Sequence, residues 1–316
     1  MKKAFVAELK PGQAFNAPFL VQAKERKTGR NGSAYLDLEL RDATGWIRGK
    51  LWDCDRFSAP FEVDDIVQAG GSVETFQGTP QMNVREIHRL ADAEVNLLDY
   101  MPRTRQDPEQ MYAALIERIN SLPEGPVRAL LLETLRDPSI AAKYKLAPAA
   151  TVMHHAFLGG LLEHVTSLCG LAELVCGHYP WLDRSLMLAG IVLHDIGKTE
   201  ELNYSRSFRY STRGQLLGHI VIGMEIVRDK MSAIPDFPPV LKERIEHIIL
   251  SHHGKLEFGS PKEPMFPEAL VVHALDEMDS KLESMRAQYE AEKGQDGDWT
   301  NRNLALGRKL LKPLGN

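Results

Sequence analysis

SLMLAGIVLHDIGK, residues 185–198, is an apolar run that ends in adjacent histidine and aspartate side chains. Its apolar residues are spread around nearly the whole helical circumference, a pattern typical of a helix buried on every side. Gly197 follows the run, and we expect it to end the helix in the left-handed conformation that glycine adopts most easily. The helix is therefore expected to carry His194 and Asp195 into the middle of a helical bundle.

Other imidazole and carboxylate side chains occur in further helical runs. These runs are LLGHIVIGMEIV (216–227), ERIEHIILSHHG (243–254) and ALVVHALDEMDSKLESM (269–285). In the first run, helical spacing places His219 on one face with Leu216 and Ile220. The candidate ligands outside the opening segment are His164, His219, His252, His253 and Asp276. Several helices that each direct such side chains inward are typical of a metal site in a bundle.

The number of these side chains favours a metal centre over separate structural roles. A single histidine in an apolar helix is usually a hydrogen-bonded core residue, and a single aspartate is usually a helix cap. Several of them buried together without partners would cost about 1–3 kcal/mol each. A shared metal centre removes that cost. A carboxylate beside an imidazole can also share its oxygens between two cations, an arrangement suited to the hydrolysis of phosphate esters.

The first hundred residues have a different pattern. Short alternating segments separated by turn residues predict strands at 14–27, 34–42, 46–53, 65–76 and 81–90. Strands at this spacing indicate a small closed or half-closed barrel. Helical periodicity begins with MYAALIERINSL (111–122), after a link that contains Pro102 and Pro108. We therefore expect a multidomain α and β protein, with a small β-barrel over 1–100 and an all-α helical bundle over 108–316.

Composition limits the classes of function. The formal net charge of −5 excludes nucleic-acid binding through an overall positive field, so any such contact must be a local patch. Cys54, Cys169 and Cys176 form no CxxC pair, which fits a reducing cytosol. Glu8 and Lys10 interrupt the start of the chain, and no apolar run has the length of a membrane helix. We expect a cytoplasmic protein.

Candidate nucleic-acid contacts occur in both parts of the chain. In the barrel, Tyr35, Trp52 and Phe76 could stack on bases while Arg48 and Lys50 contact phosphates. The same residues equally suit a filled barrel with solvated charges. In ELNYSRSFRYSTRGQ (201–215), arginines that include Arg206 and Arg209 alternate with aromatic residues, typical of a segment that contacts a nucleic-acid backbone or of a solvated hairpin. The tail RNLALGRKLLKPL (302–314) indicates a short basic helix of no assigned role.

These motifs resemble a known family. The order His164, His194-Asp195, Asp276 resembles the HD superfamily of metal-dependent phosphohydrolases. The strings that resemble the YhaM-like 3′-to-5′ exoribonucleases of bacteria are HHAFLGGLLEH (154–164), LAGIVLHDIGK (188–198), GQLLGHIVIG (214–223), ILSHHGKLEFGSP (249–261) and PEALVVHALDEMDSK (267–281). YLDLELRDATGWIRGKLWD (35–53) resembles the OB-fold of anticodon-type nucleic-acid-binding domains.

The resemblance implies two divalent metal ions and a substrate. The first cation would be held by His164, His194, Asp195 and Asp276. The second would share Asp195 and be held by His219 and by His252, His253 or both. Lys198 would contact a nonbridging phosphate oxygen. Manganese is the expected metal, with iron, cobalt, nickel, zinc and magnesium as alternatives. The implied reaction is hydrolysis of single-stranded RNA, and of single-stranded DNA as a further substrate, to nucleoside monophosphates.

Two other interpretations use the same residues. An HD phosphodiesterase could act on a small cyclic or pyrophosphorylated nucleotide, with the barrel serving in assembly of a homo-oligomer. A noncatalytic single-strand-binding protein could keep the helical bundle as a scaffold. The complete set of candidate ligands argues against a scaffold, and the size of the substrate would separate the first interpretation from an exoribonuclease.

Overall fold

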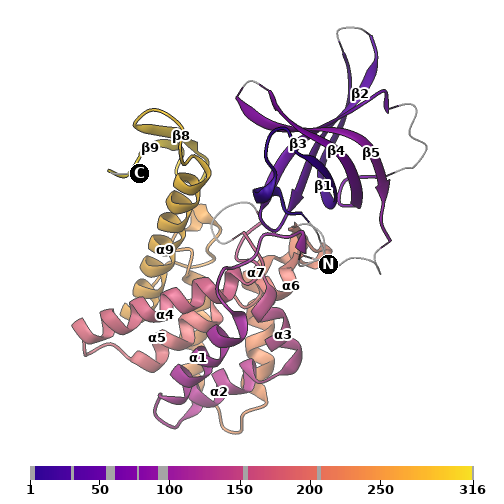
Figure 1. Ribbon diagram of the computed structural model, residues 1–316. Helices are drawn as coiled ribbons and strands as arrows, with labels where there is room; N and C mark the ends of the chain where they lie inside the picture. The colour runs from indigo at the N-terminus through magenta and orange to yellow at the C-terminus, as the bar shows by residue number, and fades with distance from the viewer. Residues whose placement is uncertain are drawn as a thin grey trace. The chain divides into compact units, whose positions relative to one another are not determined.

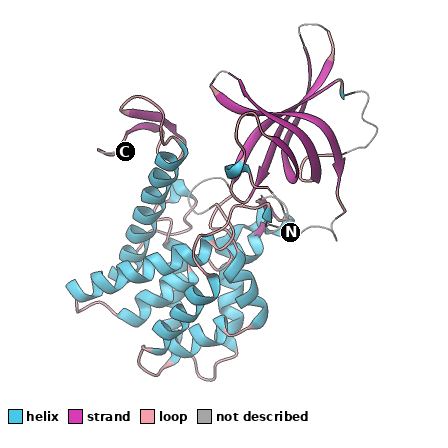
Figure 2. Ribbon diagram, viewed as in Figure 1, coloured by secondary structure: helices cyan, strands magenta, loops and turns pink. Residues whose placement is uncertain are grey.

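The computed structural model describes residues 4–29, 32–54, 61–76, 78–91, 99–151, 156–204 and 208–314. These residues form two compact units, one that ends at Arg103 and one that begins at Thr104 (Figure 1). The first unit is built from strands and the second mainly from helices (Figure 2). The expected fold class, a small barrel followed by a helical bundle, is confirmed.

The first unit is a closed five-stranded barrel in the order β1-β2-β3-β5-β4. Its strands are β1 (Ala14–Thr28), β2 (Ala34–Asp42), β3 (Gly45–Trp52), β4 (Ile66–Phe76) and β5 (Thr79–Arg89). All neighbouring pairs are antiparallel except β3 and β5, which are parallel. Alternate residues of β3 point inward, because Ile47, Gly49 and Leu51 are buried while the residues between them face outward. This period of two produces the apolar interior.

Two glycines shape the part of the barrel where β4 pairs with β5. A Cβ at Gly71 would lie 2.0 Å from the backbone oxygen of Asn83, so only glycine permits this close strand approach. The pairing of the strands shifts register between Gly70 and Gly71. Gly78 has φ of +80°, which lets the chain turn between the two strands. The β4–β5 hairpin therefore depends on the missing side chain at Gly71 and on backbone freedom at Gly78.

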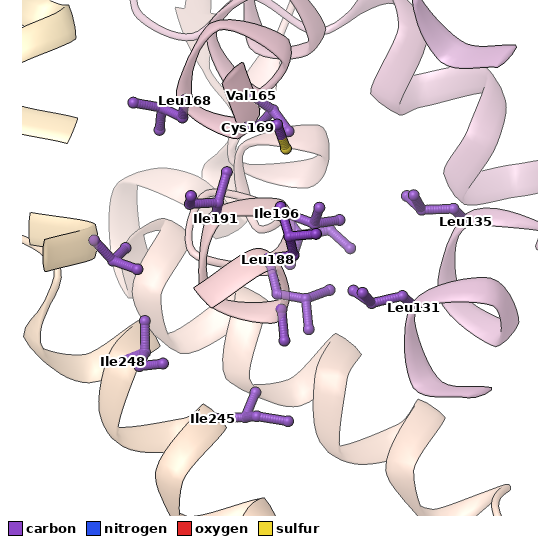
Figure 3. Packing of buried hydrophobic residues seen from close by; sticks show 14 of the residues in the cluster. Leu131, Leu135, Val165, Leu168, Cys169, Leu188, Ile191, Ile196, Ile245 and Ile248 are labelled. Carbon is purple, nitrogen blue, oxygen red and sulfur yellow. The ribbon is translucent and has the colours of Figure 1, made fainter. Parts of the chain in front are cut away.

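The second unit is a helical bundle. Its helices are α1 (Pro108–Asn120), α2 (Pro126–Leu135), α3 (Pro138–Leu146), α4 (Gly160–His178), α5 (Arg184–Leu193), α6 (Lys198–Glu201), α7 (Thr212–Ser232), α8 (Pro239–Ser251) and α9 (Pro267–Ala291). Every residue of α5 from Leu186 to Leu193 is buried. Figure 3 shows Leu188 and Ile191 of α5 packed among apolar side chains of neighbouring helices. The expected all-round burial of this helix is confirmed.

The end of α5 differs from the expectation in one respect. Gly197 has right-handed helical angles (φ −61°, ψ −22°), so the prediction of a left-handed cap there is wrong. Glycine is needed at this position for another reason. A Cβ would lie 2.0 Å from the backbone oxygen of His219, so Gly197 permits contact between two segments. Gly254, which follows α8, does have a left-handed φ of +79°.

Helix α7 contains a kink that sequence periodicity does not show. Gly218 has non-helical angles (φ 72°, ψ 160°). Residues before the kink therefore do not share a helical face with the residues after it. Leu216 is consequently 77% exposed, although its spacing predicted a face shared with His219 and Ile220. That prediction is wrong for Leu216, while Ile220 is buried.

Two small antiparallel sheets are attached to the helical unit. One pairs β6 (Leu202–Asn203) with β7 (Arg209–Tyr210). The other pairs β8 (Trp299–Asn303) with β9 (Arg308–Leu311), so the predicted short basic helix in the tail is wrong. Among the described residues, no helix has the length and apolar character needed to span a membrane.

Candidate metal centre

Helices α4, α5, α7, α8 and α9 bring the candidate ligands to one place. His164 belongs to α4 and Asp276 to α9. His194 is the C-terminal cap of α5, and Asp195 follows it. Two groups of side chains have ligand atoms that lie within 4.8 Å of one another. The first group is His164, His194 and Asp195, and the second is His219, His252 and His253.

Asp276 completes the first group. Its Oδ1 lies 3.1 Å from Nε2 of His164 and 3.9 Å from Nε2 of His194. Oδ2 of Asp195 lies 3.4 Å from the same atom of His194. Two imidazole nitrogens and two carboxylates therefore face one point in a buried setting. Such a donor set suits a transition-metal cation.

Asp195 lies between the two groups. Its Oδ2 faces His194 and the ammonium of Lys198. Its Oδ1 lies 3.6 Å from Nε2 of His219 and 3.7 Å from Nε2 of His252. A carboxylate whose two oxygens face separate groups of imidazoles can be shared by two cations.

Hydrogen bonds to the other ring nitrogen fix the orientation of each candidate histidine. Nδ1 of His194 donates to the backbone oxygen of Ile191 over 2.8 Å, and Nδ1 of His252 donates to that of Ile249 over 2.8 Å. Nδ1 of His253 donates to the oxygen of Phe258 over 3.0 Å. Because a carbonyl oxygen only accepts, these rings carry their proton on Nδ1 when neutral. Nε2 is then unprotonated and able to bind a metal.

Carboxylates orient the remaining two rings. Nδ1 of His164 lies 2.7 Å from Oδ2 of Asp279, and Nδ1 of His219 lies 3.1 Å from Oε1 of Glu201. Glu201 also accepts from the backbone N–H of His219 over 2.8 Å. A carboxylate that orients a histidine and increases its basicity is a common outer partner of metal ligands.

Histidine pKa values are shifted in opposite directions in the two groups of ligands, upward for His164 and downward for His252 and His253. Although burial opposes it, hydrogen bonds to Asp276 and Asp279 raise the pKa of His164 to about 9. Burial and the neighbouring His194 hold the pKa of His252 well below its usual value. Burial and His219 also lower the pKa of His253. The carboxylates around His164 therefore favour a positive charge in the first group, which a proton supplies without a metal ion and a bound cation would supply in its place. The lowered pKa values of His252 and His253 keep these two rings neutral, as metal ligands must be.

Lys198 contacts Asp195 directly. Its Nζ donates to Oδ2 over 2.6 Å. Burial disfavours the ammonium, but the charge of Asp195 outweighs this effect and raises the pKa of Lys198. The lysine that was expected to contact a phosphate oxygen therefore neutralises a candidate metal ligand in this structure.

The predicted aromatic contacts belong to three strands, Tyr35 to β2, Trp52 to β3 and Phe76 to the end of β4. The rings of Tyr35 and Trp52 are 4.7 Å apart. Nζ of Lys50 lies over both rings and over that of Phe76, at 5.4, 5.5 and 5.1 Å from their centres. Phe76 is 54% exposed. This cluster therefore belongs to the surface and does not fill the barrel, although Tyr35 is half-buried.

The same face contains a cavity of about 500 Å³. Trp46, which is 57% exposed, lines it together with Arg48, Lys50 and Phe76. Trp46 was absent from the predicted contacts, although its spacing with Arg48 and Lys50 along β3 could have identified it. Acids stand opposite two of its cations in the strand register, Asp37 opposite Lys50 and Glu39 opposite Arg48, although Asp37 forms an ion pair with Lys27 over 2.7 Å. The face is therefore aromatic and carries charges of both signs.

The second predicted basic segment is only partly described. Arg209 lies in β7 and is exposed. Arg206 lies outside the described residues, as do His154 and His155 of the first string that resembled the exoribonucleases.

Comparison with known proteins agrees with both units. Residues 20–90 match the family of OB-fold nucleic-acid-binding domains, and residues 161–281 match the HD domain family. The 3′-5′ exoribonuclease YhaM of Bacillus subtilis is 34% identical over 96% of this chain and 96% of its own length. The chain belongs to the YhaM family. YhaM proteins of Bacillus licheniformis and of a Geobacillus strain are 34% and 32% identical over 96% of this chain and 96% and 93% of theirs.

The HD domain of the YhaM family implies dependence on divalent metal ions, and the side chains of this chain fit that requirement. Nε2 of His194, His219 and His252 is buried without a hydrogen-bond partner within the described part of the chain. Oδ1 of Asp195 is in the same state. Buried polar atoms without partners are costly, and these four converge on the same space. Bound cations would satisfy all of them.

Three residues that support the metal centre were not predicted from the sequence. Asp279 and Glu201 orient His164 and His219, as described above. His273 donates from Nδ1 to the backbone oxygen of His252 over 2.8 Å, and its ring lies where a side chain at Gly254 would be. Asp279 follows Asp276 by three residues, and this helical spacing could have identified it. Glu201 and His273 have no comparable local signal.

Proposed function

We propose that this chain is a metal-dependent 3′-to-5′ exoribonuclease that hydrolyses single-stranded RNA to nucleoside monophosphates. The observation that carries the proposal is the convergence of three unpaired imidazole nitrogens and one unpaired carboxylate oxygen in a buried site. Membership of the YhaM family supports the direction and the substrate, since the relatives bear the name 3′-5′ exoribonuclease.

The proposed ligands divide between two cations. His164, His194, Asp195 and Asp276 would hold the first. Asp195, His219 and the pair His252 and His253 would hold the second, with both histidines in reach. Bound cations would acidify water and neutralise charge on the scissile phosphate. Imidazole and carboxylate ligands suit manganese, our first choice, as well as iron, cobalt, nickel and zinc, and magnesium less well.

The residues of the chain would supply orientation and charge balance. Asp279 and Glu201 keep two imidazoles in the orientation that binding requires. Lys198 offsets the negative charge of Asp195. Once a cation takes over that role, the ammonium would be available to a nonbridging phosphate oxygen, with Asp195 one helical turn away. We propose the catalytic group as His194, Asp195 and Lys198.

The barrel would hold the RNA strand. Tyr35, Trp52 and Phe76 offer stacking surfaces around Lys50, and Arg48 lines the adjacent cavity. Base stacking on aromatic side chains tolerates any sequence, as an exonuclease needs. Arg206 and Arg209 remain proposed backbone contacts. In this proposal, residues 1–100 bind RNA, residues 108–316 perform the hydrolysis, and the protein acts in the cytoplasm.

The test is digestion of labelled single-stranded RNA with manganese present, resolved by product length. We expect mononucleotides released in order from the 3′ end, slow reaction when the 3′ end carries a phosphate, and no effect of a 5′ block. The variant Asp195→Ala is the control. Internal cuts that appear first would contradict the direction. Hydrolysis of cyclic or pyrophosphorylated nucleotides without digestion of RNA would favour the small-nucleotide enzyme instead.

A further inference from the structure

The hairpin of β8 and β9 concentrates positive charge. Residues 299–314 contain Arg302, Arg308, Lys309 and Lys312 and no acidic residue, whereas the whole chain has a net charge of −5. Arg302 and Lys309 are register partners on adjacent strands. Arg308 follows the turn at Gly307, which has φ of +64°. The cations therefore lie together on one short hairpin.

Three of these cations are available to a ligand. Arg302, Arg308 and Lys309 are exposed, and none forms an ion pair with another residue that the structure describes. Lys312 is different, because its Nζ donates to the backbone oxygen of Gln295 over 2.7 Å. Like charges placed side by side repel each other, so their grouping favours an anionic partner.

Helix α9 holds the hairpin in place. Nε2 of Gln288 donates to the backbone oxygen of Asn301 over 2.9 Å, and the hydroxyl of Tyr289 donates to that of Leu311 over 3.1 Å. The amide of Asn303 donates to Ser284 over 3.2 Å. A two-stranded hairpin alone is marginally stable in water. These contacts order the hairpin at the C-terminal end of α9, as Figure 1 shows.

An aromatic surface adjoins the cations. Trp299 pairs in register with Leu311 and is 59% exposed. An exposed indole beside unpaired arginine and lysine side chains is a combination that binds single-stranded nucleic acid through stacking and phosphate contacts. The aromatic face of the barrel differs, because Asp37 and Glu39 stand opposite Lys50 and Arg48 in the strand register, whereas the hairpin contains no acidic residue. The hairpin therefore adds a surface with an excess of positive charge.

We propose that the β8–β9 hairpin is a second binding surface for single-stranded RNA, which contacts phosphates of the strand 5′ to the nucleotide being removed. The inference rests on the proposed function. Helix α9 carries Asp276 of the metal centre and ends at Ala291, about 22 Å further along its axis. A dinucleotide at the metals is too short to span that distance, so only longer RNA would reach the hairpin.

A second copy of the chain is the competing occupant. Leu304 and Leu314 are exposed, and a two-stranded sheet has open edges to which another strand could add. Charge argues against this pairing. Two such hairpins in symmetric contact would bring two groups of unpaired cations together, and like charges across an interface are destabilising. The phosphates of RNA would neutralise the same cations.

The experiment compares two triple variants of the full-length protein. Arg302→Gln, Arg308→Gln and Lys309→Gln together remove the unpaired charges of the hairpin. The control variant removes the same number of positive charges from α8 and the end of α2, by the substitutions Arg136→Gln, Lys242→Gln and Arg244→Gln. Binding of long single-stranded RNA is measured against salt concentration, and hydrolysis of a dinucleotide is measured in parallel. Thermal unfolding verifies that both variants are folded.

The affinity for RNA should fall less steeply with salt in the hairpin variant than in the wild type. We expect the slope of log affinity against log salt concentration to be shallower by about 2, since each of three phosphate contacts with a single strand contributes about 0.7. Between about 50 and 200 mM salt the wild type should therefore lose about twentyfold more affinity than this variant. The control should keep the wild-type slope, and dinucleotide hydrolysis should be unchanged in both. Trp299→Ala should weaken long-RNA binding more than Trp181→Ala, a second exposed tryptophan outside the hairpin.

Other results would overturn the inference. Equal salt slopes of the hairpin variant, the control and the wild type would exclude phosphate contacts. An altered oligomeric state of the hairpin variant with unchanged RNA affinity would assign the surface to a second copy. Failure of the wild type to digest RNA would overturn the proposed function, whereas normal digestion by a hairpin variant with unchanged binding of long RNA would overturn only this inference.

Discussion

The metal centre and the aromatic face of the barrel differ in how strongly their surroundings define a ligand. At the metal centre, Nε2 of His194, His219 and His252 is buried and has no partner among the residues described. On the barrel, Trp46 and Phe76 are more than half exposed, and water can solvate the cations beside them. Burial makes an unsatisfied polar atom costly, whereas exposure leaves it at little cost. The first site therefore requires a ligand, and the second only permits one.

The two sites also differ in rigidity. Each candidate histidine of the metal centre has its second ring nitrogen hydrogen-bonded to a backbone oxygen or a carboxylate. On the barrel face, Nζ of Lys50 lies over three aromatic rings, at 5.1 to 5.5 Å from their centres. Fixed orientation suits metal coordination, while a less constrained face suits bases of any identity.

The largest effect should follow from Asp195→Ala. This change removes the oxygens that face both groups of ligands, so we expect loss of most bound metal and a fall in RNA hydrolysis of about a thousandfold or more. Elemental analysis and single-turnover digestion measure the two results. Full metal content after replacement of both His194 and Asp195 would refute the metal centre as described.

A smaller effect is expected from Asp279→Asn. The carboxylate that fixes Nδ1 of His164 is lost, and metal affinity should fall by about 10–100-fold. Ser167→Ala is the matched control, because it removes only the hydroxyl that donates to Oδ1 of Asp279 over 2.6 Å, and its loss should be smaller. Calorimetric titration with manganese measures both. Equal affinity of Asp279→Asn and the wild type would show that the outer carboxylate does not orient the ligand.

Two glycine-to-alanine variants distinguish a close contact near the metal centre from a simple effect of helix propensity. Gly197→Ala would place a Cβ 2.0 Å from the oxygen of His219, so we expect a loss of about 1–3 kcal/mol in the free energy of unfolding. A Cβ added at Gly170 of α4 would meet only open space. Gly170→Ala should therefore increase the free energy of unfolding by up to about 1 kcal/mol. Urea unfolding distinguishes the two. A stable Gly197→Ala protein with unchanged metal content would contradict the close approach of these segments.

The smallest effect is expected on the barrel. Trp52→Ala removes a ring that contacts Tyr35 and Lys50, and the Michaelis constant for long RNA should rise about tenfold, since stacking contributes roughly 1–3 kcal/mol per base. Hydrolysis of a dinucleotide should stay constant. Trp181→Ala, which removes an exposed ring from the helical unit, should change neither value. An unchanged Michaelis constant for Trp52→Ala would favour assembly over RNA binding as the role of this face.

The sequence by itself determined the barrel strands, the buried helix α5 and most of the candidate centre. Period-two alternation gave the barrel strands, and all-round apolarity identified α5 as a buried helix. The spacing of histidine and aspartate residues in apolar helices predicted a shared site, and the structure brings all seven candidate ligands together. These features were predictable because the periodicity of each element, and the ligands that it carries, depend on residues that are near in sequence.

Only the tertiary structure decided the features that depend on contacts between distant segments. Gly197 is required by the backbone of His219, and Glu201 orients that histidine from 18 residues away. The kink at Gly218 exposes Leu216, which helical spacing had placed on the face of His219. The tail forms a hairpin because α9 hydrogen-bonds to it. Local periodicity carries no information about which remote surface a segment meets, and packing can therefore override it.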